Sequence, residues 1–479
     1  MSTLLVILYL INLLFALFLI FYRERDTSVT WAWLLVFMFI PFLGFILYLF
    51  FGLGLSKKER YDIKHQISLD FNTLEDIYDP TLQLYDDIPS DSKHKQLAYF
   101  MSNLNHTPLT HHNKVKILVD GQKKLESLLH DIKNAQKFIH IEYYAFVTDE
   151  TGMKVVDLLT EKAKEGVEIC LLYDELGSKG VQKSKFAKLI EAGGKIQTFV
   201  TSEKAILKFR VNYHDHRKIV IIDGKTSYIG GFNIADQYVE TTKKFGYWRD
   251  THLRINGPAT SILELRFLSD WNVSVPENEK LLGKLDYLYH EKPNESAHTD
   301  IQIIASGPHD EKQQIKLAFT KLITSAKKRV WIQTPYFIPD DTILDALKIA
   351  KQSGVDVKIM IPNKPDHPFI YRATQYFAQV AMKYDVDVFI YEGGFLHSKV
   401  LIMDDDVSIV GSANQDIRSY KLNFEASAVM YDASINNELT HYFNKDLNQS
   451  TQLTQQTIDE MSIWLKFKQK TARLFSPIM

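Results

Sequence analysis

The chain has 479 residues, of which 46% are hydrophobic, so it is long enough for two or three domains of roughly 100–200 residues. Its 56 lysines and arginines nearly balance its 58 aspartates and glutamates, which excludes a global basic field and makes nucleic acid a disfavoured partner. The single cysteine, Cys170, excludes an intrachain disulfide framework and a cysteine-cluster metal site.

The N-terminus contains two long uncharged runs. Residues 3–22 lack charge over 20 residues, and residues 31–53 lack it over 23; each run, as a helix, can cross about 30 Å of hydrocarbon. A cleavable signal peptide is the alternative for the first run, but no basic segment precedes it and a second run follows. We therefore expect a two-helix transmembrane hairpin over residues 1–60, in which Pro41 and Gly44 of the second run are tolerable.

Flanking charge predicts the orientation of this hairpin. The short connection contains Arg23 and Arg25, whereas four basic residues follow the second run: Lys57, Lys58, Arg60 and Lys64. The positive-inside rule then places the remainder of the chain in the cytoplasm. The expected location is the cell membrane, as a multi-pass protein whose remaining domains face the cytoplasm.

An α/β pattern follows a polar segment, residues 61–110, that we expect to be a linker. The β-rich runs VKILVD, KFIHIEYYAF and VEICLLYDE alternate with helical stretches, which is typical of an α/β domain. Residues 300–363 repeat this order, and GVDV at 354–357 matches GVEI at 166–169. Such agreement indicates an internal duplication, so we predict two copies of one α/β domain, at residues 111–290 and 291–479.

One residue pattern occurs in both copies at identical spacing. The first copy reads His216-x-Lys218-x4-Asp223-x6-Gly230-Gly231-x-Asn233, and the second reads His397-x-Lys399-x4-Asp404-x6-Gly411-Ser412-x-Asn414. On a strand His214, His216 and Lys218 all point to one face, so local geometry does not select one histidine. Because His214 corresponds to Phe395, the repeat selects His216.

Phosphodiester exchange by double displacement needs such a set twice. One neutral imidazole can attack phosphorus while a second, protonated one supplies the proton to the leaving alkoxide, and the roles then reverse. Lys218 and Lys399 would bind the non-bridging oxygens, and Asn233, Asn414 and Ser412 would act as neutral donors to the phosphate. This chemistry requires no divalent cation and the sequence shows no constellation for one, so we expect no metal and no cofactor.

Two kinds of carboxylate accompany the motifs. A histidine used in this way needs a partner for its other nitrogen, and we expect Asp250 and Glu425, which follow the first and second motif, to orient the histidines; surface pairing or capping is the alternative. Asp223 and Asp404 belong to the repeated pattern and thus to the candidate catalytic set. Each ends an apolar run beside turn residues, however, which favours a structural role in pinning the turn or pairing with a basic residue.

The doubled pattern resembles the phospholipase D superfamily, whose HxK(x)4D(x)6G(S/G)xN motif occurs twice per active site. Within it the chain is similar to bacterial cardiolipin synthases, in the N-terminal runs and in the stretches IEYYAF, NYHDHRK, GYWRDTHLRINGP, QTPYFIPD, GSANQDIRS and RLFSP. The resemblance implies two fused phospholipase D-like α/β domains with mixed sheets flanked by helices. One departure from a symmetric pattern is Gly231, where the second copy has Ser412.

The resemblance also implies an activity: two phosphatidylglycerol molecules would condense to cardiolipin and glycerol through a phosphatidyl-histidine intermediate. The implied nucleophile is His216 and the implied acid/base is His397, although the sequence itself is symmetric. Membrane lipids are the implied partners. A phospholipase D hydrolase that uses water as acceptor is the nearest alternative, because acceptor choice depends on how the pocket excludes water.

Two other functions fit the sequence less well. A nucleic-acid phosphodiesterase conflicts with the charge balance and the two apolar runs. A non-catalytic scaffold with decayed sites would be expected to lack a motif residue, yet both histidine–lysine pairs and both asparagines are intact.

Two further features leave alternatives open. Glu142 and Gln333 occupy matching strand ends, where a functional position or a buried polar contact is plausible. The C-terminal stretch WLKFKQKTARLF alternates bulky apolar residues with basic ones, so it could lie on an anionic membrane surface or form an exposed helix packed on its domain.

Overall fold

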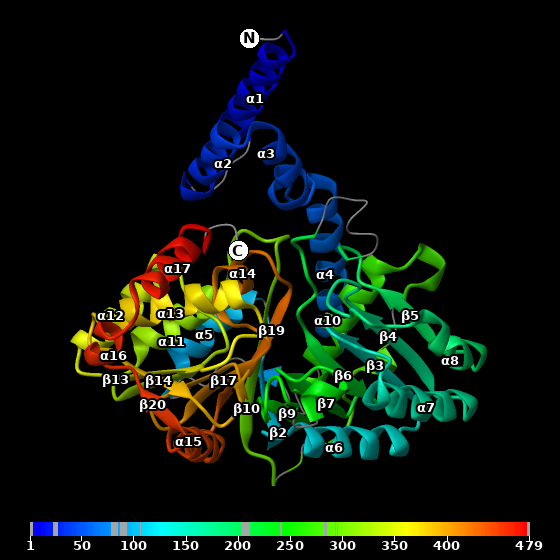
Figure 1. Cartoon of the computed structure of the whole chain (residues 1–479). Coiled ribbons are helices and arrows are strands. Elements are labelled where there is room, and N and C mark those ends of the chain that lie inside the picture. Colours follow the sequence, from blue (N-terminus) through cyan, green and yellow to red (C-terminus); the bar gives the residue numbers. More distant parts are fainter. Residues whose placement is uncertain are drawn as a thin grey trace.

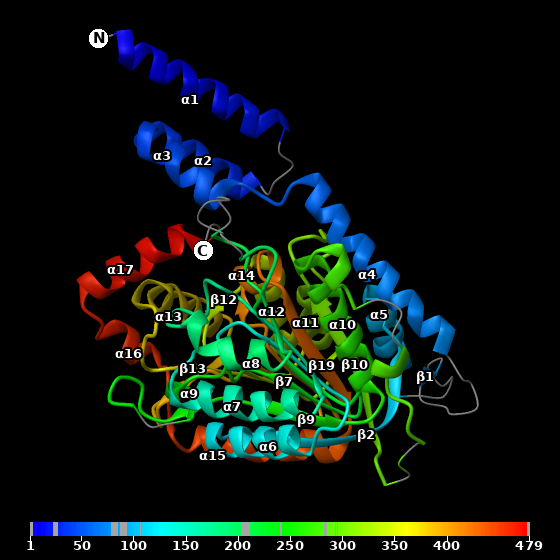
Figure 2. The same ribbon diagram turned by 90° about the vertical axis from the view of Figure 1, so that its right-hand side faces the viewer.

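The computed structural model describes residues 3–22, 27–77, 85–86, 93–105, 107–202, 211–239, 242–281, 285–292, 294 and 296–476. Arg23 and Arg25, on which the predicted orientation partly depends, lie outside these residues. In the described part the N-terminal helices project from an α/β body (Figure 1), and the view turned by 90° shows the same arrangement (Figure 2).

The N-terminal apolar segment forms α1 (Thr3–Tyr22), α2 (Thr27–Phe39), α3 (Pro41–Leu47) and a π-helical turn, Tyr48–Gly52. The second predicted run is therefore not one continuous helix. Pro41 occupies the first turn of α3, where its missing N–H costs nothing, but it cannot continue the hydrogen-bonding pattern of α2. Within the described part of the chain, no helix combines the length and apolarity that crossing a membrane requires.

Two helices occupy the segment expected to be a linker. α4 (Lys57–Ile77) packs against α10 (Ala259–Ser274), and α5 (Lys95–Asn105) packs against the second half of the chain. Ile63 of α4 is buried in the same hydrophobic core as Ile262 of α10. α4 thus connects the N-terminal helices to the body through a packed contact.

The duplicated halves form one continuous mixed sheet of sixteen strands within the described residues. From its outer edge inward the first half contributes β5 (Lys195–Thr198), β4 (Glu168–Tyr173), β3 (Phe138–Tyr143), β6 (Lys218–Ile222), β7 (Thr226–Gly230), β9 (His252–Asn256) and β2 (Leu109–Leu118). The second half contributes β14 (Asp387–Tyr391), β13 (Asp356–Pro362), β11 (Arg329–Gln333), β16 (Val400–Met403), β17 (Val407–Gly411), β19 (Glu425–Tyr431) and β10 (Thr299–Ser306).

The two strand orders match element for element, and the halves meet where β2 pairs with β10 in antiparallel fashion. Two strands complete the sheet: β20 (Ser450–Gln452) extends the second half beyond β14, and β1 (Tyr85–Asp86) pairs with β2. The mixed α/β architecture predicted from the sequence is confirmed. The copies share one sheet, however, and the line along which the two halves meet is called the seam below. Each motif lies at this seam, next to residues of the other copy.

Helices cover both faces of this sheet. The side chains of β3 alternate between two cores, because successive residues of a strand point to opposite faces. Ile139 and Ile141 pack with α6 (Gly121–Asn134) and α7 (Glu150–Lys164), whereas Phe138 packs in the core that contains α10. In the second half the helices that pack against the sheet are α11 (Gln314–Ser325), α12 (Asp341–Gln352) and α13 (Pro368–Met382). α15 (Ala433–Leu447) corresponds to α10 of the first half.

The remaining elements are short, except for the last helix. α8 (Ala187–Glu191), α9 (Asp236–Val239) and β8 (Trp248–Arg249) belong to the first half. The second half contains β12 (Phe337–Ile338), β15 (Phe395–Leu396), β18 (Gln415–Asp416), α14 (Ile417–Lys421), α16 (Gln455–Asp459) and α17 (Ile463–Leu474). β8 and β15 pair with each other across the seam and position the site.

Candidate active site

Each motif is held in place by the opposite half of the chain. The backbone N–H of His216 donates to the carbonyl of Phe424 at 2.9 Å, and that of His397 donates to the carbonyl of Arg249 at 2.7 Å. β8 and β15 pair in parallel immediately before the contact of His397, and Asp215 forms a parallel bridge to Phe424 beside the contact of His216. Because each histidine is held by the other half of the chain, the structure brings the two motifs together in one site.

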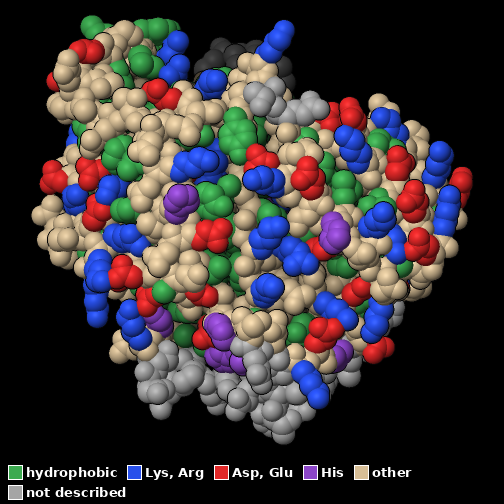
Figure 3. Space-filling model, turned by 90° about the horizontal axis from the view of Figure 1, so that it is seen from below, with side chains coloured by type: hydrophobic (Ala, Val, Ile, Leu, Met, Phe, Trp, Pro, Cys, Tyr) green, Lys and Arg blue, Asp and Glu red, His purple; other side chains and the backbone are tan. Residues whose placement is uncertain are grey.

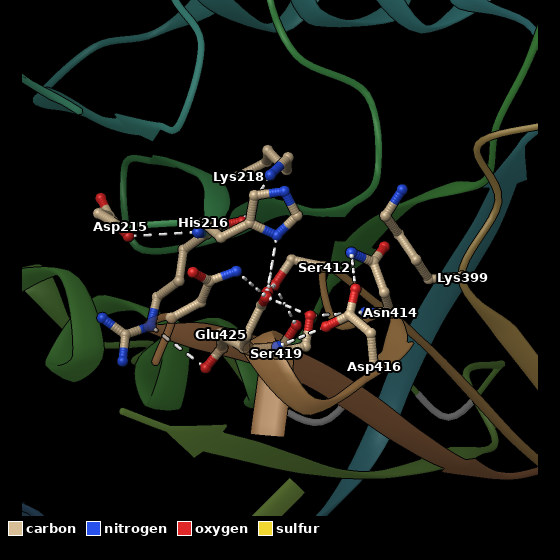
Figure 4. A network of polar contacts seen from close by, with 12 residues as sticks. Asp215, His216, Lys218, Lys399, Ser412, Asn414, Asp416, Ser419 and Glu425 are labelled. Carbon is tan, nitrogen blue, oxygen red and sulfur yellow. Dashed lines mark hydrogen bonds and ion pairs between the residues drawn. The ribbon is translucent and has the colours of Figure 1, made fainter. Parts of the chain in front are cut away.

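The histidine–carboxylate pairs cross between the halves. Nδ1 of His216 lies 3.0 Å from both carboxylate oxygens of Glu425 (Figure 4), and Nδ1 of His397 lies 2.5 Å from Oδ2 of Asp250. Both carboxylates are fully buried, whereas His216 is 8% and His397 is 7% exposed. A carboxylate on Nδ1 fixes the tautomer that leaves Nε2 as the reactive nitrogen. The spacing along the chain predicts the two acids but not the crossed pairing.

The two lysines begin or precede strands next to the histidines and are buried. Nζ of Lys218 donates to the carbonyl of His216 at 2.5 Å, and Nζ of Lys399 donates to the carbonyl of His397. In Figure 4 Lys218 appears beside His216, and Lys399 appears beside Asn414. Burial lowers the pKa of Lys218 to about 7 and that of Lys399 to about 8.

Burial and charge also set the protonation of the paired groups. Burial lowers the pKa of His216 and of His397 to about 4, so both imidazoles are neutral near pH 7. Burial would raise the pKa of Glu425 and of Asp250, but the neighbouring histidines and lysines outweigh it and lower both. A bound phosphodiester anion would favour the protonated forms of the histidines and lysines.

The departure at Gly231 has a steric cause. A Cβ at this position would lie 2.0 Å from Oδ1 of Asp250, so a serine there would displace the carboxylate that contacts His397. Glu425 is one methylene longer, and the corresponding Ser412 donates its hydroxyl to Oε2 of Glu425 at 2.5 Å. In the structure the hydroxyl of Ser412 thus contacts the carboxylate that pairs with His216, and its expected role as a donor to phosphate stays a prediction.

The two asparagines lie in the site with part of their hydrogen-bonding capacity used. Asn233 accepts from the N–H of Ala145 at 3.1 Å and donates to Tyr238 Oη at 3.0 Å. Asn414 donates to Asp416 at 3.1 Å, and its Oδ1 is buried without a partner among the described residues. Each amide group can donate twice, so one N–H of each is compatible with the expected contact to phosphate.

The two motif aspartates lie apart from the histidines. Asp223 accepts from the backbone N–H groups of residues 136–138 at 2.7–3.1 Å, and Asp404 accepts from those of residues 327–329 at 2.7–3.1 Å. Both occupy turns with positive φ, 54° and 49°, at the far end of a strand about 16 Å long from the lysine. Their placement in the catalytic set is thus corrected: the structure gives them the turn-pinning role.

His214 lies near the site without a strong partner. Its Nδ1 is 3.5 Å from Oδ1 of Asp174, beyond good hydrogen-bond geometry, and its ring meets Tyr144 edge-on at 5.6 Å. The ring of Tyr144 contacts His216 more closely, at 4.9 Å, and lies 5.1 Å from Nζ of Lys218. Tyr144 therefore forms a wall of the site, and on the other side Trp248 lies 5.1 Å from His397.

Sequence reasoning does not single out two buried arginines that support the site. Arg217 donates to Asp270 at 2.5 Å and to the carbonyl of Glu425 at 3.3 Å, and Arg249 donates to Asp446 at 2.9 Å. The sequence points to them only by position: Arg217 directly follows His216 in NYHDHRK, and Arg249 directly precedes Asp250 in GYWRD.

The matching residues Glu142 and Gln333 join these clusters. Glu142 lies 3.8 Å from Arg217, and Gln333 donates to Asp446 at 2.8 Å. Both side chains are buried, as expected for the buried polar contact that was the alternative to a functional position.

The fold and the paired histidine, lysine and asparagine residues define a phospholipase D-like protein with one site built from two repeats. Residues 128–258 and 319–447 match the family described as cardiolipin synthase, PLD-like domain, and residues 7–52 match the family described as phospholipase D-nuclease N-terminal. The chain belongs to the cardiolipin synthase family and is a phospholipase D-type phosphatidyltransferase.

Similar proteins cover the whole chain. A cardiolipin synthase of Listeria monocytogenes serotype 4a (strain HCC23) is 44% identical over 486 residues, covering 100% of this chain and 99% of that one. The major cardiolipin synthase of Bacillus subtilis (strain 168) is 43% identical over 485 residues with the same coverage. The crystal structure of phosphatidylserine synthase from Haemophilus influenzae Rd KW20 has a TM-score of 0.62 at 15% identity, covering 80% of this chain and 98% of that one, which shows a shared fold.

Proposed function

We propose that the substrate is phosphatidylglycerol and that the chain transfers a phosphatidyl group from one molecule to another, giving cardiolipin and glycerol. The observation that supports this proposal is the crossed arrangement of two buried histidines, each with its own carboxylate, at one seam. A double displacement needs two imidazoles on opposite sides of one phosphorus, and two separate sites would not provide them.

In the first half-reaction Nε2 of His216 attacks the phosphorus of one phosphatidylglycerol. The P–O bond to the glycerol headgroup breaks, and protonated His397 supplies the proton to the leaving glycerol oxygen. The product is glycerol and a phosphatidyl group bonded to His216. Glu425 stabilises the positive charge that develops on His216, and Lys218 and Lys399 neutralise the non-bridging oxygens.

The second half-reaction reverses these roles. Neutral His397 takes the proton from a hydroxyl group of the second phosphatidylglycerol, and that oxygen attacks phosphorus as the P–N bond to His216 breaks. His216 returns to its neutral form and His397 to its protonated form, so the cycle needs no further proton donor. Asp250 stabilises the protonated state of His397 while a phosphodiester is bound.

The acceptor distinguishes this proposal from hydrolysis. Tyr144 and Trp248 contact the two histidines and make the site partly apolar, which favours exclusion of water. Membranes that contain the protein and phosphatidylglycerol labelled in its headgroup and its acyl chains should yield acyl-labelled cardiolipin and headgroup-labelled glycerol in equal amounts. Acyl-labelled phosphatidic acid as the main product would show that water is the acceptor.

We also propose that the N-terminal helices embed the chain in the lipid bilayer as a hairpin, with the body on the cytoplasmic side. This proposal is supported by the uncharged runs and by large apolar side chains that the body leaves exposed, among them Leu13, Leu14, Met38 and Phe39. The basic residues of α4 follow the second run directly. Resistance of the protein to carbonate extraction would support embedding, and release would contradict it.

A further inference from the structure

α17, the last helix of the chain, exposes a large apolar surface outside the active site. Ile463 is 87%, Trp464 is 62%, Phe467 is 56% and Leu474 is 70% exposed. Ile463, Phe467 and Leu474 follow a spacing of i, i+4 and i+11, so they line one side of the helix. Trp464 stacks on Phe467 with ring centroids 5.4 Å apart. These four residues form what we call the α17 apolar face.

The opposite side of α17 attaches it firmly to the body. Gln469 and Ala472 are buried against α13, and Gln379 of α13 donates to Gln469 at 2.9 Å. In Figures 1 and 2 α17 lies between α13 and the side of the molecule from which α1 to α3 project. The α17 apolar face is therefore presented on the same side as the exposed apolar residues of the N-terminal helices.

Basic residues accompany this apolar face. Lys468 and Lys470 are exposed, Arg473 stacks on Tyr376, and Nζ of Lys468 lies 5.2 Å from the Trp464 ring. α17 contains no acidic residue. In contrast, the face seen from below in Figure 3, away from the N-terminal helices, intersperses acidic and basic side chains. Aromatic and aliphatic residues with lysines around them are typical of a helix that lies in the headgroup region of an anionic membrane.

We infer that α17 is a second membrane contact, lying in the interface of a bilayer that contains anionic phospholipid, with Ile463, Trp464, Phe467 and Leu474 inserted. The alternative occupant is a second copy of this chain. The cores of protein–protein interfaces are depleted in lysine, whereas Lys466 and Lys468 flank Phe467 here and Lys470 lies one helical turn after Phe467. Continuity with the N-terminal helices, on whose proposed embedding this inference rests for orientation, also favours lipid.

The chain offers a direct way to test this placement. Its single cysteine, Cys170, is fully buried, so a cysteine introduced by Phe467→Cys can be labelled selectively with a polarity-sensitive fluorophore in the full-length protein. Ile190→Cys on α8 is the matched control, because Ile190 is 55% exposed, close to the 56% of Phe467. Leu14→Cys on α1 reports separately whether the N-terminal helices are embedded.

The three labelled proteins are reconstituted in vesicles of phosphatidylglycerol and phosphatidylcholine in equal parts, with and without a phospholipid that has a quencher at headgroup depth. We expect a blue shift and strong quenching at position 467, and neither at position 190. Raising the salt concentration should reduce the quenching at 467, because the attraction of lysines to anionic lipid is screened. Quenching at 467 no stronger than at 190, while the label at 14 is shielded, would overturn the inference.

Two further outcomes separate the possible failures. A label at 14 that stays in water would contradict the embedding of the N-terminal helices and with it the inferred orientation of α17. A blue shift at 467 that is insensitive to the lipid quencher and grows with protein concentration would show that a second copy covers the α17 apolar face, and would also overturn the inference. None of these readouts depends on phosphatidyl transfer.

Discussion

The two halves of the sheet share one strand order, yet they orient their histidines with different residues. In the first half Gly231 leaves room for the short Asp250, which contacts His397; in the second half Ser412 hydrogen-bonds the longer Glu425, which contacts His216. The side chain at the glycine or serine position and the length of the carboxylate compensate each other. The duplication therefore preserves the place of a carboxylate oxygen, while the residues that reach it have diverged.

The supporting arginines show the same difference. Arg217 directly follows His216 and pairs with Asp270 of α10. The corresponding residue of the second half is Ser398, and Arg249 of the first half instead pairs with Asp446 of α15. The first motif thus contains its own supporting arginine, whereas the second motif relies on Arg249, which belongs to the first half. Neither half is complete alone, which is a reason why both copies are needed for one reaction.

The largest expected effects concern the two histidines. His216→Ala should lower kcat/KM by at least about 10⁴-fold on any substrate, because the proposed nucleophile is lost. His397→Ala should cost about 10²–10⁴-fold on phosphatidylglycerol, which is the range for a general acid. A donor whose leaving group needs no proton, such as a p-nitrophenol ester, should restore adduct formation in His397→Ala only. Rescue of both variants, or of neither, would contradict the different roles of the two histidines.

Exchanging the glycine and serine should affect the halves unequally. Gly231→Ser places its Cβ against Asp250 and should lower kcat by about 10²–10³-fold, since His397 loses its orienting partner. Ser412→Gly removes one hydrogen bond to Glu425 and should cost about tenfold, for roughly 1.5 kcal/mol. Steady-state kinetics on mixed micelles measure both, and equal losses would mean that the compensation between the two positions is absent.

The lysines predict an alkaline limb in the pH profile. Burial lowers the pKa to about 7 for Lys218 and to about 8 for Lys399, and only the protonated forms bind phosphate oxygens as cations. kcat/KM should therefore fall more steeply above about pH 7 to 8 than the loss of protonated His397, with its pKa of about 4, causes by itself. Lys218→Arg should move this steepening to higher pH, because arginine stays charged. A slope that stays constant up to pH 10 would show that the lysines remain protonated.

The turn aspartates should behave alike in the two halves. Asp223→Asn and Asp404→Asn each weaken hydrogen bonds to three successive backbone N–H groups, so each should lower the free energy of unfolding by about 1–3 kcal/mol. Activity below the unfolding transition should stay close to that of the unmodified protein. Residual activity measured after heating to increasing temperatures gives both the stability of each variant and its activity below the unfolding transition. A large loss of activity in a folded variant would return these aspartates to the catalytic set.

The smallest expected effect is that of His214→Ala. Its imidazole has no strong partner and no counterpart in the second half, so kcat/KM should stay within about threefold of the unmodified protein, equivalent to roughly 0.6 kcal/mol. A loss comparable to that of His216→Ala would mean that the repeat selects the wrong histidine.

Much of the fold could be predicted because its cause lies in local sequence. Apolar runs such as FIHIEY give buried strands, and their repeated order indicates the duplication. His216 lies just before β6, which begins at Lys218, so strand periodicity does not place this histidine. The crossed pairs could not be predicted, because distance along the chain does not show that β8 and β15 become neighbours. The contact of Ser412 with Glu425 was likewise hidden, since a hydroxyl fits a phosphate and a carboxylate equally well.

The break in the second apolar run shows a different limit. Hydropathy sums the residues from 31 to 53 without regard to backbone geometry, whereas Pro41 divides this run into separate helices. Composition thus indicates an apolar segment but does not give the continuity of its helices.

The central claim is that both motifs form one site and not two. It is tested most directly by counting covalent adducts after rapid acid-free quenching with acyl-labelled phosphatidylglycerol, followed by mass spectrometry of the histidine peptides. We predict at most one phosphatidyl group per chain, located on His216, in the unmodified protein and in His397→Ala supplied with an activated donor, and none in His216→Ala. Two adducts per chain, or an adduct on each remaining histidine of the single variants, would contradict a shared site.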